Sequence, residues 1–234
     1  MEIIFTDVLG IAEEYKPVPT FTKIPDWYKN MDTYMSGEKR PDGKGETTAT
    51  IKKCMPVFDV MSTGYYLLTY TDLWVSQRIQ GENSVKTPWF EWPTFEPITF
   101  HPNPQAHLHP QAVENQGVPK WINPWSIETP PGYSTLFLPP VHRDNIFVAL
   151  PGLVDTDNYT PPVNIVFTLK DPNFEGIVPA GTPIAQVIPI KREPWKMILG
   201  EQPNIEKSEK LAKRLRTVFF DAYKTLHRQK KEYT

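Results

Sequence analysis

Proline is the sequence feature that most limits how this chain can fold, because 26 of its 234 residues are proline. That share is about twice the average of globular proteins. A proline ring cannot donate a hydrogen bond to a β-ladder, and it breaks the interior of a helix. The composition therefore favours short strands joined by rigid extended connections over long helices. Since aromatic residues make up 12% of the chain, we expect the proline-rich segments to pack against rings.

The length and composition are those of one globular domain. Hydrophobic residues make up 39% and charged residues 22% of the chain, so a core can form without metal or disulfide crosslinks. We expect a single domain over 1–234, with an N-terminal extended segment (1–45), a β core (46–200) and a C-terminal helix (204–230). A formal net charge of −2 argues against general attraction to nucleic acid or to an anionic membrane.

The first residues and the cysteine content predict the compartment. The start, MEIIFTDVLG, lacks the basic region and the long apolar core of a signal peptide. The chain contains no run of apolar residues long enough to span a bilayer. The lone Cys54 excludes an intramolecular disulfide. We therefore expect a cytoplasmic protein with no membrane partner.

Residue periodicity predicts a mainly β chain. Between Thr48 and Val75, β-branched and aromatic residues, Val57 and Val60 among them, predict two or three strands. Turn residues separate four further predicted strands, at 133–138, 146–150, 163–169 and 184–190. This short spacing is typical of β-sandwiches and barrels. Earlier in the chain, Asp26 predicts the start of a short helical turn.

The segment from Ile205 to Arg228 predicts a helix because it contains neither proline nor glycine. Apolar residues recur at steps of three or four and predict one buried stripe, formed by Leu211, Leu215, Phe219, Ala222 and Leu226. Lysine and arginine dominate the rest of the helix, which could contact nucleic acid or an acidic protein. However, a helix with a buried stripe must place its charges in solvent, and no aromatic platform accompanies them. We therefore favour a solvated face over a nucleic-acid site.

The segment from Gly152 to Pro189 contains two short motifs. The pattern G-x-x-D-x-D begins at Gly152, and the pattern G-x-x-I-A-Q begins at Gly181. Together with the sequence PPGYSTLFLPP at 130–140, they resemble motifs of the dUTP pyrophosphatase family. The resemblance implies a β-sandwich or barrel of the β-clip type. Because that family commonly builds trimers, it also implies a homo-oligomer.

The same resemblance implies roles for individual side chains. Asp155 matches the residue that activates a water as a general base. Ligand-binding positions would be filled by Asp157, Tyr159, Gln186 and Arg143. The alternative is structural: the polar side chains at 155–158 cap a tight hairpin, and Gly181 serves a turn with positive φ.

The chain departs from the dUTP pyrophosphatase pattern where phosphates are bound. Pro139 and Pro140 stand in the phosphate loop, and proline lacks the backbone N–H that would donate to a phosphate. Asn158 separates Tyr159 from the second aspartate, and Pro183 replaces an expected arginine. The glycine-rich C-terminal arm of the family is missing. These departures favour a retained fold over a retained activity.

Three longer sequences resemble an uncharacterised domain family of bacteria and tailed phages. They are TIKKCMPVFDVMSTGY, NPWSIETPPGYS and GTPIAQVIPIKREPW, and the resemblance covers most of the chain. That family carries no known activity. It implies a single domain and a phage origin, in which case the protein would work in the host cytosol or the virion.

A histidine cluster suggests a divalent metal site. The sequence HLHPQAVE has the pattern H-x-H-x4-E, which resembles the first metal-binding motif of cupins. Alternate residues of a strand face the same side, so His107 and His109 could share an iron or manganese ion with Glu114, and His142 would add a fourth ligand. Pro110 interrupts this strand. Histidines in such surroundings also often only pack, and that alternative stays open.

Three functional hypotheses follow from these patterns. The leading one is a non-catalytic binding or assembly module, encoded by a phage. The alternatives are a metal-dependent cupin-like enzyme using the cluster from His101 to Glu114, and a nucleotide-binding protein related to dUTP pyrophosphatases. Four tryptophans in a proline-rich frame could form an aromatic interface, but we expect them in the core: Trp89, Trp92, Trp121 and Trp125.

Overall fold

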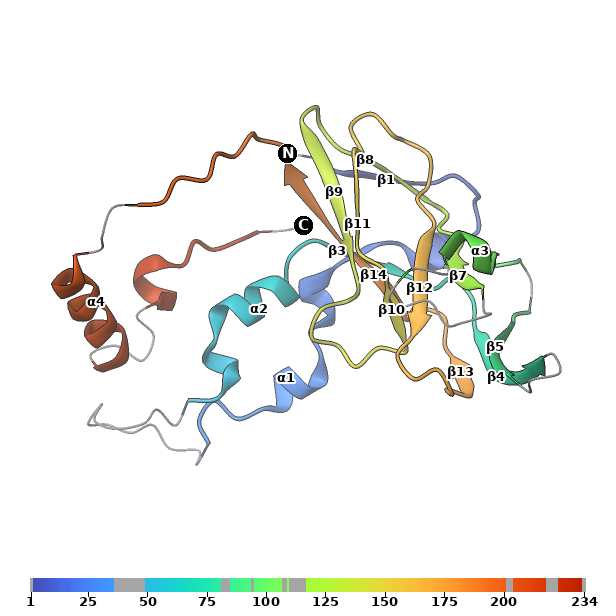
Figure 1. Cartoon of the computed structure of the whole chain (residues 1–234), viewed down its shortest axis with the longest axis horizontal. Helices are drawn as coiled ribbons and strands as arrows, with labels where there is room; N and C mark the ends of the chain where they lie inside the picture. The colour runs from blue at the N-terminus through green and yellow to red at the C-terminus, as the bar shows by residue number, and fades with distance from the viewer. Residues whose placement is uncertain are drawn as a thin grey trace. The chain divides into compact units, whose positions relative to one another are not determined.

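The computed structural model describes residues 2–35, 49–80, 85–93, 95–106, 109, 117–200, 204–217 and 223–232. Strands make up 35% and helices 20% of the structure, so the predicted mainly β class is confirmed. The chain divides into two compact units (Figure 1). The first unit contains Met1–Thr20 and Gly64–Arg192, and the second contains Phe21–Thr63 and Glu193–Thr234. A single domain over the whole chain stays a prediction.

The first unit holds all the strands described. In chain order they are β1 (Ile4–Asp7), β2 (Val18–Pro19), β3 (Tyr65–Leu68), β4 (Leu73–Gln80), β5 (Val85–Glu91), β6 (Ile98–His101), β7 (Val118–Trp121), β8 (Trp125–Glu128), β9 (Tyr133–Leu138), β10 (Phe147–Ala149), β11 (Gly152–Val154), β12 (Ile165–Leu169), β13 (Gly176–Val178) and β14 (Pro183–Lys191). Two short helical elements accompany them, η1 (Glu13–Tyr15) and α3 (Asn103–Ala106).

These strands pair antiparallel, and over the described residues they form four sheets. The orders are β1-β8, β10-β12-β7-β6, β11-β9-β14-β3-β2 and β13-β4-β5. No sheet closes into a barrel in this part of the chain. The long pairing of β14 with β9 and β3 needs Gly64, whose φ is +78° and whose missing Cβ would lie 2.1 Å from the Val187 carbonyl oxygen. No side chain larger than hydrogen fits there.

One predicted β region is a helix. Val57 and Val60 lie in α2 (Met55–Met61) and not in a strand. Pro56 occupies the first turn of this helix, where proline is favoured because its missing N–H has no partner there in any helix. The helix start signal at Pro56 therefore outweighs the β propensity of the branched side chains. Within the predicted region the first strand is β3.

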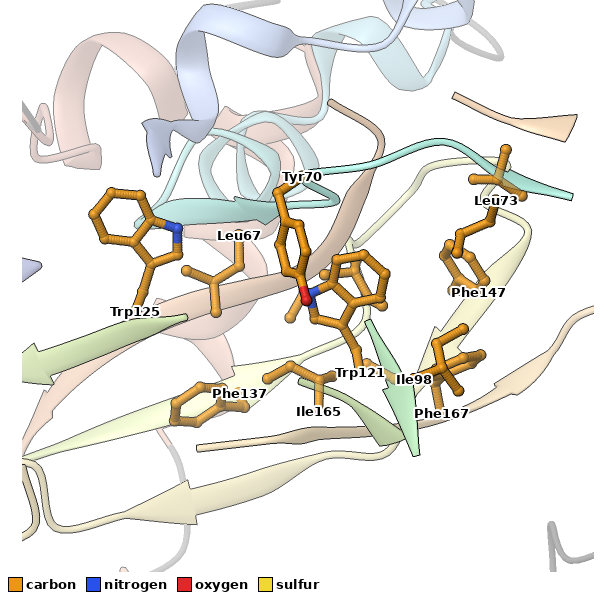
Figure 2. Close-up of a cluster of buried hydrophobic side chains, with 14 of the residues drawn as sticks. Leu67, Tyr70, Leu73, Ile98, Trp121, Trp125, Phe137, Phe147, Ile165 and Phe167 are labelled. Carbon is orange, nitrogen blue, oxygen red and sulfur yellow. The ribbon is translucent and has the colours of Figure 1, made fainter. Parts of the chain in front are cut away.

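The core of the first unit is aromatic (Figure 2). The Tyr70 and Trp121 rings lie 4.8 Å apart between centroids. Phe167 contacts Phe147 and Phe90 edge-on, at 4.8 Å and 5.9 Å. Trp121 and Trp125 are buried here, as predicted, whereas Trp92 is half-buried and Trp89 is exposed. Among the side chains labelled in Figure 2, Trp121 of β7, Trp125 of β8 and Phe137 of β9 come from three different sheets.

The regular elements described in the second unit are helical. It contains α1 (Asp26–Asn30), η3 (Ile51–Lys53), α2, α4 (Ile205–Thr217) and a π-helical turn, η4 (Tyr223–His227); η2 (Thr20–Lys23) leads into it. The helical turn predicted at Asp26 is confirmed by α1. Leu211 of the predicted buried stripe is exposed, while Phe219 and Ala222 lie outside the described residues. One helix running from 205 to 228 therefore stays a prediction.

None of the helices in the described part of the chain combines the length and apolar composition that a membrane span requires.

Candidate functional site

The two predicted aspartates lie in the turn that follows β11. The Asp155 carbonyl oxygen accepts hydrogen bonds from the backbone N–H groups of Asn158 and Tyr159, at 3.0 Å and 2.8 Å. Asp157 Oδ2 accepts from the Gly132 N–H at 2.8 Å, which ties this turn to the one before β9. Gly181 has a φ of +81°, as its predicted turn requires. The structural alternative accounts for these contacts without a ligand.

Arg192, at the end of β14, holds both carboxylates. Its Nη1 donates to Asp155 Oδ1 at 3.2 Å, to Asp157 Oδ1 at 2.9 Å and to the Tyr133 carbonyl at 2.8 Å. Its Nη2 donates to Asp157 Oδ2, so the Asp157 pair is bidentate. We call Arg192, Asp155, Asp157 and Ser134 the Arg192 cluster.

The two carboxylates of this cluster differ in exposure. The Asp157 side chain is only 5% exposed, and hydrogen bonding from Arg192 holds the pKa of Asp157 below its ordinary value. Asp155 is 60% exposed, but its Oδ1 accepts from the Ser134 hydroxyl at 2.6 Å as well as from Arg192. The cluster therefore has the character of a structural clasp.

In the loop that would bind phosphate, a backbone N–H group already donates to the side chain of Gln186, another residue that we predicted to bind a ligand. Gln186 is fully buried, and its Oε1 accepts from the Val141 N–H at 3.2 Å. The preceding Pro139 and Pro140 have no N–H to offer. The guanidinium of Arg143 lies 5.3 Å from the centre of the Tyr66 ring. Tyr159 is exposed. Ligand binding by Asp157, Tyr159, Gln186 and Arg143 stays a prediction.

The histidines are only partly described. His107 and Glu114 lie outside the described residues. His109 follows α3, and His142 lies in the turn after β9, with a φ of +53°. A ring nitrogen of His101 lies 2.9 Å from Gln105 Oε1. No three His, Cys, Asp or Glu side chains among the described residues are grouped to hold a metal ion. The cupin-like site stays a prediction.

A second charged cluster, in the second unit, was not predicted from the sequence. Asp59 of α2 accepts from Arg228 Nε at 2.9 Å, from Arg228 Nη2 at 2.7 Å and from Lys231 Nζ at 2.9 Å. We call these three residues the Asp59 cluster. Only 10% of the Asp59 side chain is exposed, and hydrogen bonding from Arg228 lowers the pKa of Asp59. The cluster ties the end of the chain to α2.

A pocket of about 480 Å³ lies beside the Asp59 cluster. Its walls combine two rings, a hydroxyl and several charged groups, and they are formed by Phe21, Phe58, Ser62, Arg228, Lys230, Lys231 and Glu232. These residues all belong to the second unit. The pocket could not be predicted from the sequence. Its residues come from near 20, near 60 and near 230, and no sequence spacing indicates that they lie together.

The residues after β14 form the most exposed apolar segment described. Trp195, Met197, Ile198 and Leu199 are 77–87% exposed. Residues 194–200 have no helix or strand, and in the described part of the chain they make no hydrogen bond. We call 194–200 the apolar segment. Exposed apolar side chains grouped in this way are common on surfaces that contact another molecule.

No model of a known protein family matches this chain, and no curated protein matches its sequence. The residues described above therefore carry the functional argument.

Proposed function

We propose that this protein is a non-catalytic assembly module whose copies associate through the apolar segment. The observation that carries the proposal is the exposure of Trp195, Met197, Ile198 and Leu199. Fully burying one such side chain is worth about 1.5–3 kcal/mol, so four of them offer about 6–12 kcal/mol to the surface that covers them.

A second copy of the chain is the partner that the described residues favour. The backbone of the apolar segment has no hydrogen-bond partner among the described residues, and Figure 1 draws the segment without helix or strand after β14. β11 is an edge strand of the five-stranded sheet and carries the exposed Leu153. In β-strand addition, an extended segment of one molecule pairs with the exposed edge strand of another. The apolar segment and β11 could fill these two roles. Because one chain has both, the contact can repeat from copy to copy.

The size of this contact favours a closed ring over a single pairwise contact. Association costs about 4–15 kcal/mol in lost translational and rotational freedom, which is comparable with what one apolar segment offers. In a closed ring each copy both donates its own segment and binds the segment of a neighbour. A ring therefore forms one more contact than an open chain of the same number of copies. The trimer implied by the resemblance to dUTP pyrophosphatases is such a ring.

The proposal does not include catalysis, because the carboxylates and the loop N–H group that catalysis would use already make hydrogen bonds within the chain. Arg192 holds Asp155 and Asp157, and the Val141 N–H donates to Gln186. We keep the β-clip type of dUTP pyrophosphatases as our proposal for the fold, supported by the pairing of β9 with β11 and β14, which carry the motifs. The resemblance to the phage family supports a place in the host cytosol or the virion.

The assembly proposal is tested by the mass of the protein in solution. Light scattering during size-exclusion chromatography is expected to give a multiple of the chain mass. The double variant Trp195→Ser with Leu199→Ser should elute as a single chain. A matched control, Ile79→Ser with Ile177→Ser, removes two other exposed apolar side chains and should keep the wild-type mass. A monomeric wild type, or an unchanged mass in the segment variant, contradicts the proposal.

The non-catalytic part has its own test. Purified protein is mixed with dUTP or dCTP, and release of pyrophosphate is followed. We expect none. Turnover that disappears in Asp155→Ala would overturn the non-catalytic reading and make the Arg192 cluster an active site.

A further inference from the structure

The walls of the second-unit pocket come from three segments distant in sequence. η2 supplies Phe21, α2 and the residue after it supply Phe58 and Ser62, and the C-terminal residues 228–232 supply the charged groups. A volume of about 480 Å³ falls within the range of pockets that hold small molecules, about 300–1,000 Å³. The pocket is therefore large enough for one small ligand.

The charges of the described residues at this pocket do not cancel. Among these residues Asp59 is the one carboxylate that contacts both Arg228 and Lys231, at 2.7 Å and 2.9 Å. Lys230 and Glu232 form a separate pair at 2.9 Å, in which both side chains are exposed. Over the part of the chain that the structure describes, two acid–base pairs therefore account for two of the three cations, and one positive charge remains. An anionic ligand would neutralise it.

The pocket also presents ring surfaces. Phe58 stacks on Tyr28, with 5.7 Å between the ring centroids, and the Arg228 guanidinium lies 5.9 Å from the centre of the Phe58 ring. Phe21 is exposed at the pocket wall. The Ser62 hydroxyl donates to the Phe58 carbonyl at 2.9 Å, so its oxygen keeps the capacity to accept a hydrogen bond. Planar ligands pack well against ring faces of this kind.

We infer that this pocket binds a small organic anion that carries a planar ring. The unbalanced cation selects the charge of the ligand, and Phe21 and Phe58 select its planar part. An aromatic carboxylate and a nucleoside monophosphate share this chemistry. The inference goes beyond the proposed assembly function, and it concerns neither the apolar segment nor β11.

Isothermal titration calorimetry with the full chain tests the ligand class. The probes are benzoate, uridine monophosphate, inorganic phosphate and uridine. Benzoate or uridine monophosphate should bind at least about tenfold more tightly than phosphate, which lacks the ring, and than uridine, which lacks the charge. A preference for benzoate identifies a carboxylate ligand, and a preference for the nucleotide identifies a phosphate ligand. If no probe binds, or if uridine or phosphate binds as well as the ring-bearing anions, the inference is wrong.

Two variants locate the binding without breaking the Arg228–Asp59 pair. Lys231→Met removes the surplus charge and should weaken the bound anion about tenfold, the loss of one charge-assisted hydrogen bond. Phe21→Ala should weaken the ring-bearing anions and leave phosphate unchanged. The control is Lys207→Met on α4, where an exposed lysine outside the pocket undergoes the same change. If Lys231→Met and Lys207→Met bind the ring-bearing anions with equal affinity, the anion binds outside this pocket and the inferred site is wrong.

Discussion

Replacing Asp59 by asparagine should release the C-terminal residues of the chain from α2. The substitution keeps the shape of the side chain but removes the charge that Arg228 and Lys231 share. Hydrogen bonds to charged groups are worth about 1.5–3 kcal/mol each. Because Lys231 is partly exposed and both cations can turn to solvent, we expect a loss of about 2–3 kcal/mol in the free energy of opening, below the sum of the contacts.

Limited proteolysis measures this opening. A protease that cleaves after lysine and arginine should cut near Arg228 about 30- to 150-fold faster in Asp59→Asn, because cleavage of a transiently open segment follows its population. Asp26→Asn is the matched control: Asp26 lies in the same unit and is exposed, and among the described residues its one ion pair is with the nearby Lys29, at 3.1 Å. Digestion of Asp59→Asn at the rate of wild type and Asp26→Asn would refute the structural role of the Asp59 cluster.

The contact between Asp59 and Arg228 also determines how the stability of the attached C-terminal residues changes with pH. The pKa of Asp59 is lowered in the folded chain, chiefly by hydrogen bonding from Arg228. Its stabilising contribution is therefore fully present above the unfolded pKa of an aspartate, about 3.9. It is lost as the pH falls through the lower, folded value. Hydrogen exchange of the amides near 228 should accelerate in that acidic range in wild type, relative to Asp59→Asn at the same pH.

Three further changes probe the first unit. Phe167→Ala should lower the free energy of unfolding in urea by about 3–5 kcal/mol, because the ring is fully buried; Phe100→Ala, where the ring is exposed, should cost about 1 kcal/mol, and equal costs would contradict the described core. Arg192→Gln should raise the pKa of Asp157 toward its ordinary value, since Arg192 is the main cause of its lowering; a carboxyl NMR titration that shows no rise disproves the clasp. Gly64→Ala should unfold this unit or strongly reduce its melting temperature, because the added Cβ meets a β14 carbonyl; calorimetry showing a near-native transition would rule out that close approach.

Strand positions could be predicted from the sequence where alternation and turn residues agreed. The predicted strand at 133–138 coincides with β9, and the prediction at 184–190 lies within β14. Propensity failed at Val57 and Val60, where Pro56 starts a helix. The sheet order could not be predicted, since β14 pairs with β3, more than a hundred residues earlier in the chain.

The charged clusters show what a linear motif leaves out. The pattern at 152–157 predicts two functional aspartates but says nothing of Arg192, which lies 35 residues after Asp157. Register decides that contact: Lys191 pairs with Tyr133, and the Arg192 N–H donates to the Gly132 carbonyl at 2.7 Å. Asp59 and Arg228 are 169 residues apart. Charge pairs of this kind follow from the fold and have no local signal.

The Arg192 cluster also bears on how the apolar segment can act. Arg192 is held by two carboxylates and by the Tyr133 carbonyl, so this residue, two positions before the segment, has a fixed place within the first unit. The segment itself makes no hydrogen bond in the described part of the chain. An ordered residue close to the start of the segment reduces the conformational entropy that the segment would lose in the proposed docking. This is the usual advantage of preorganised binding elements. The aspartates of the motif at 152–157 thus have a role that needs no substrate: they hold Arg192, from which the chain leads into the segment that we propose as the association surface.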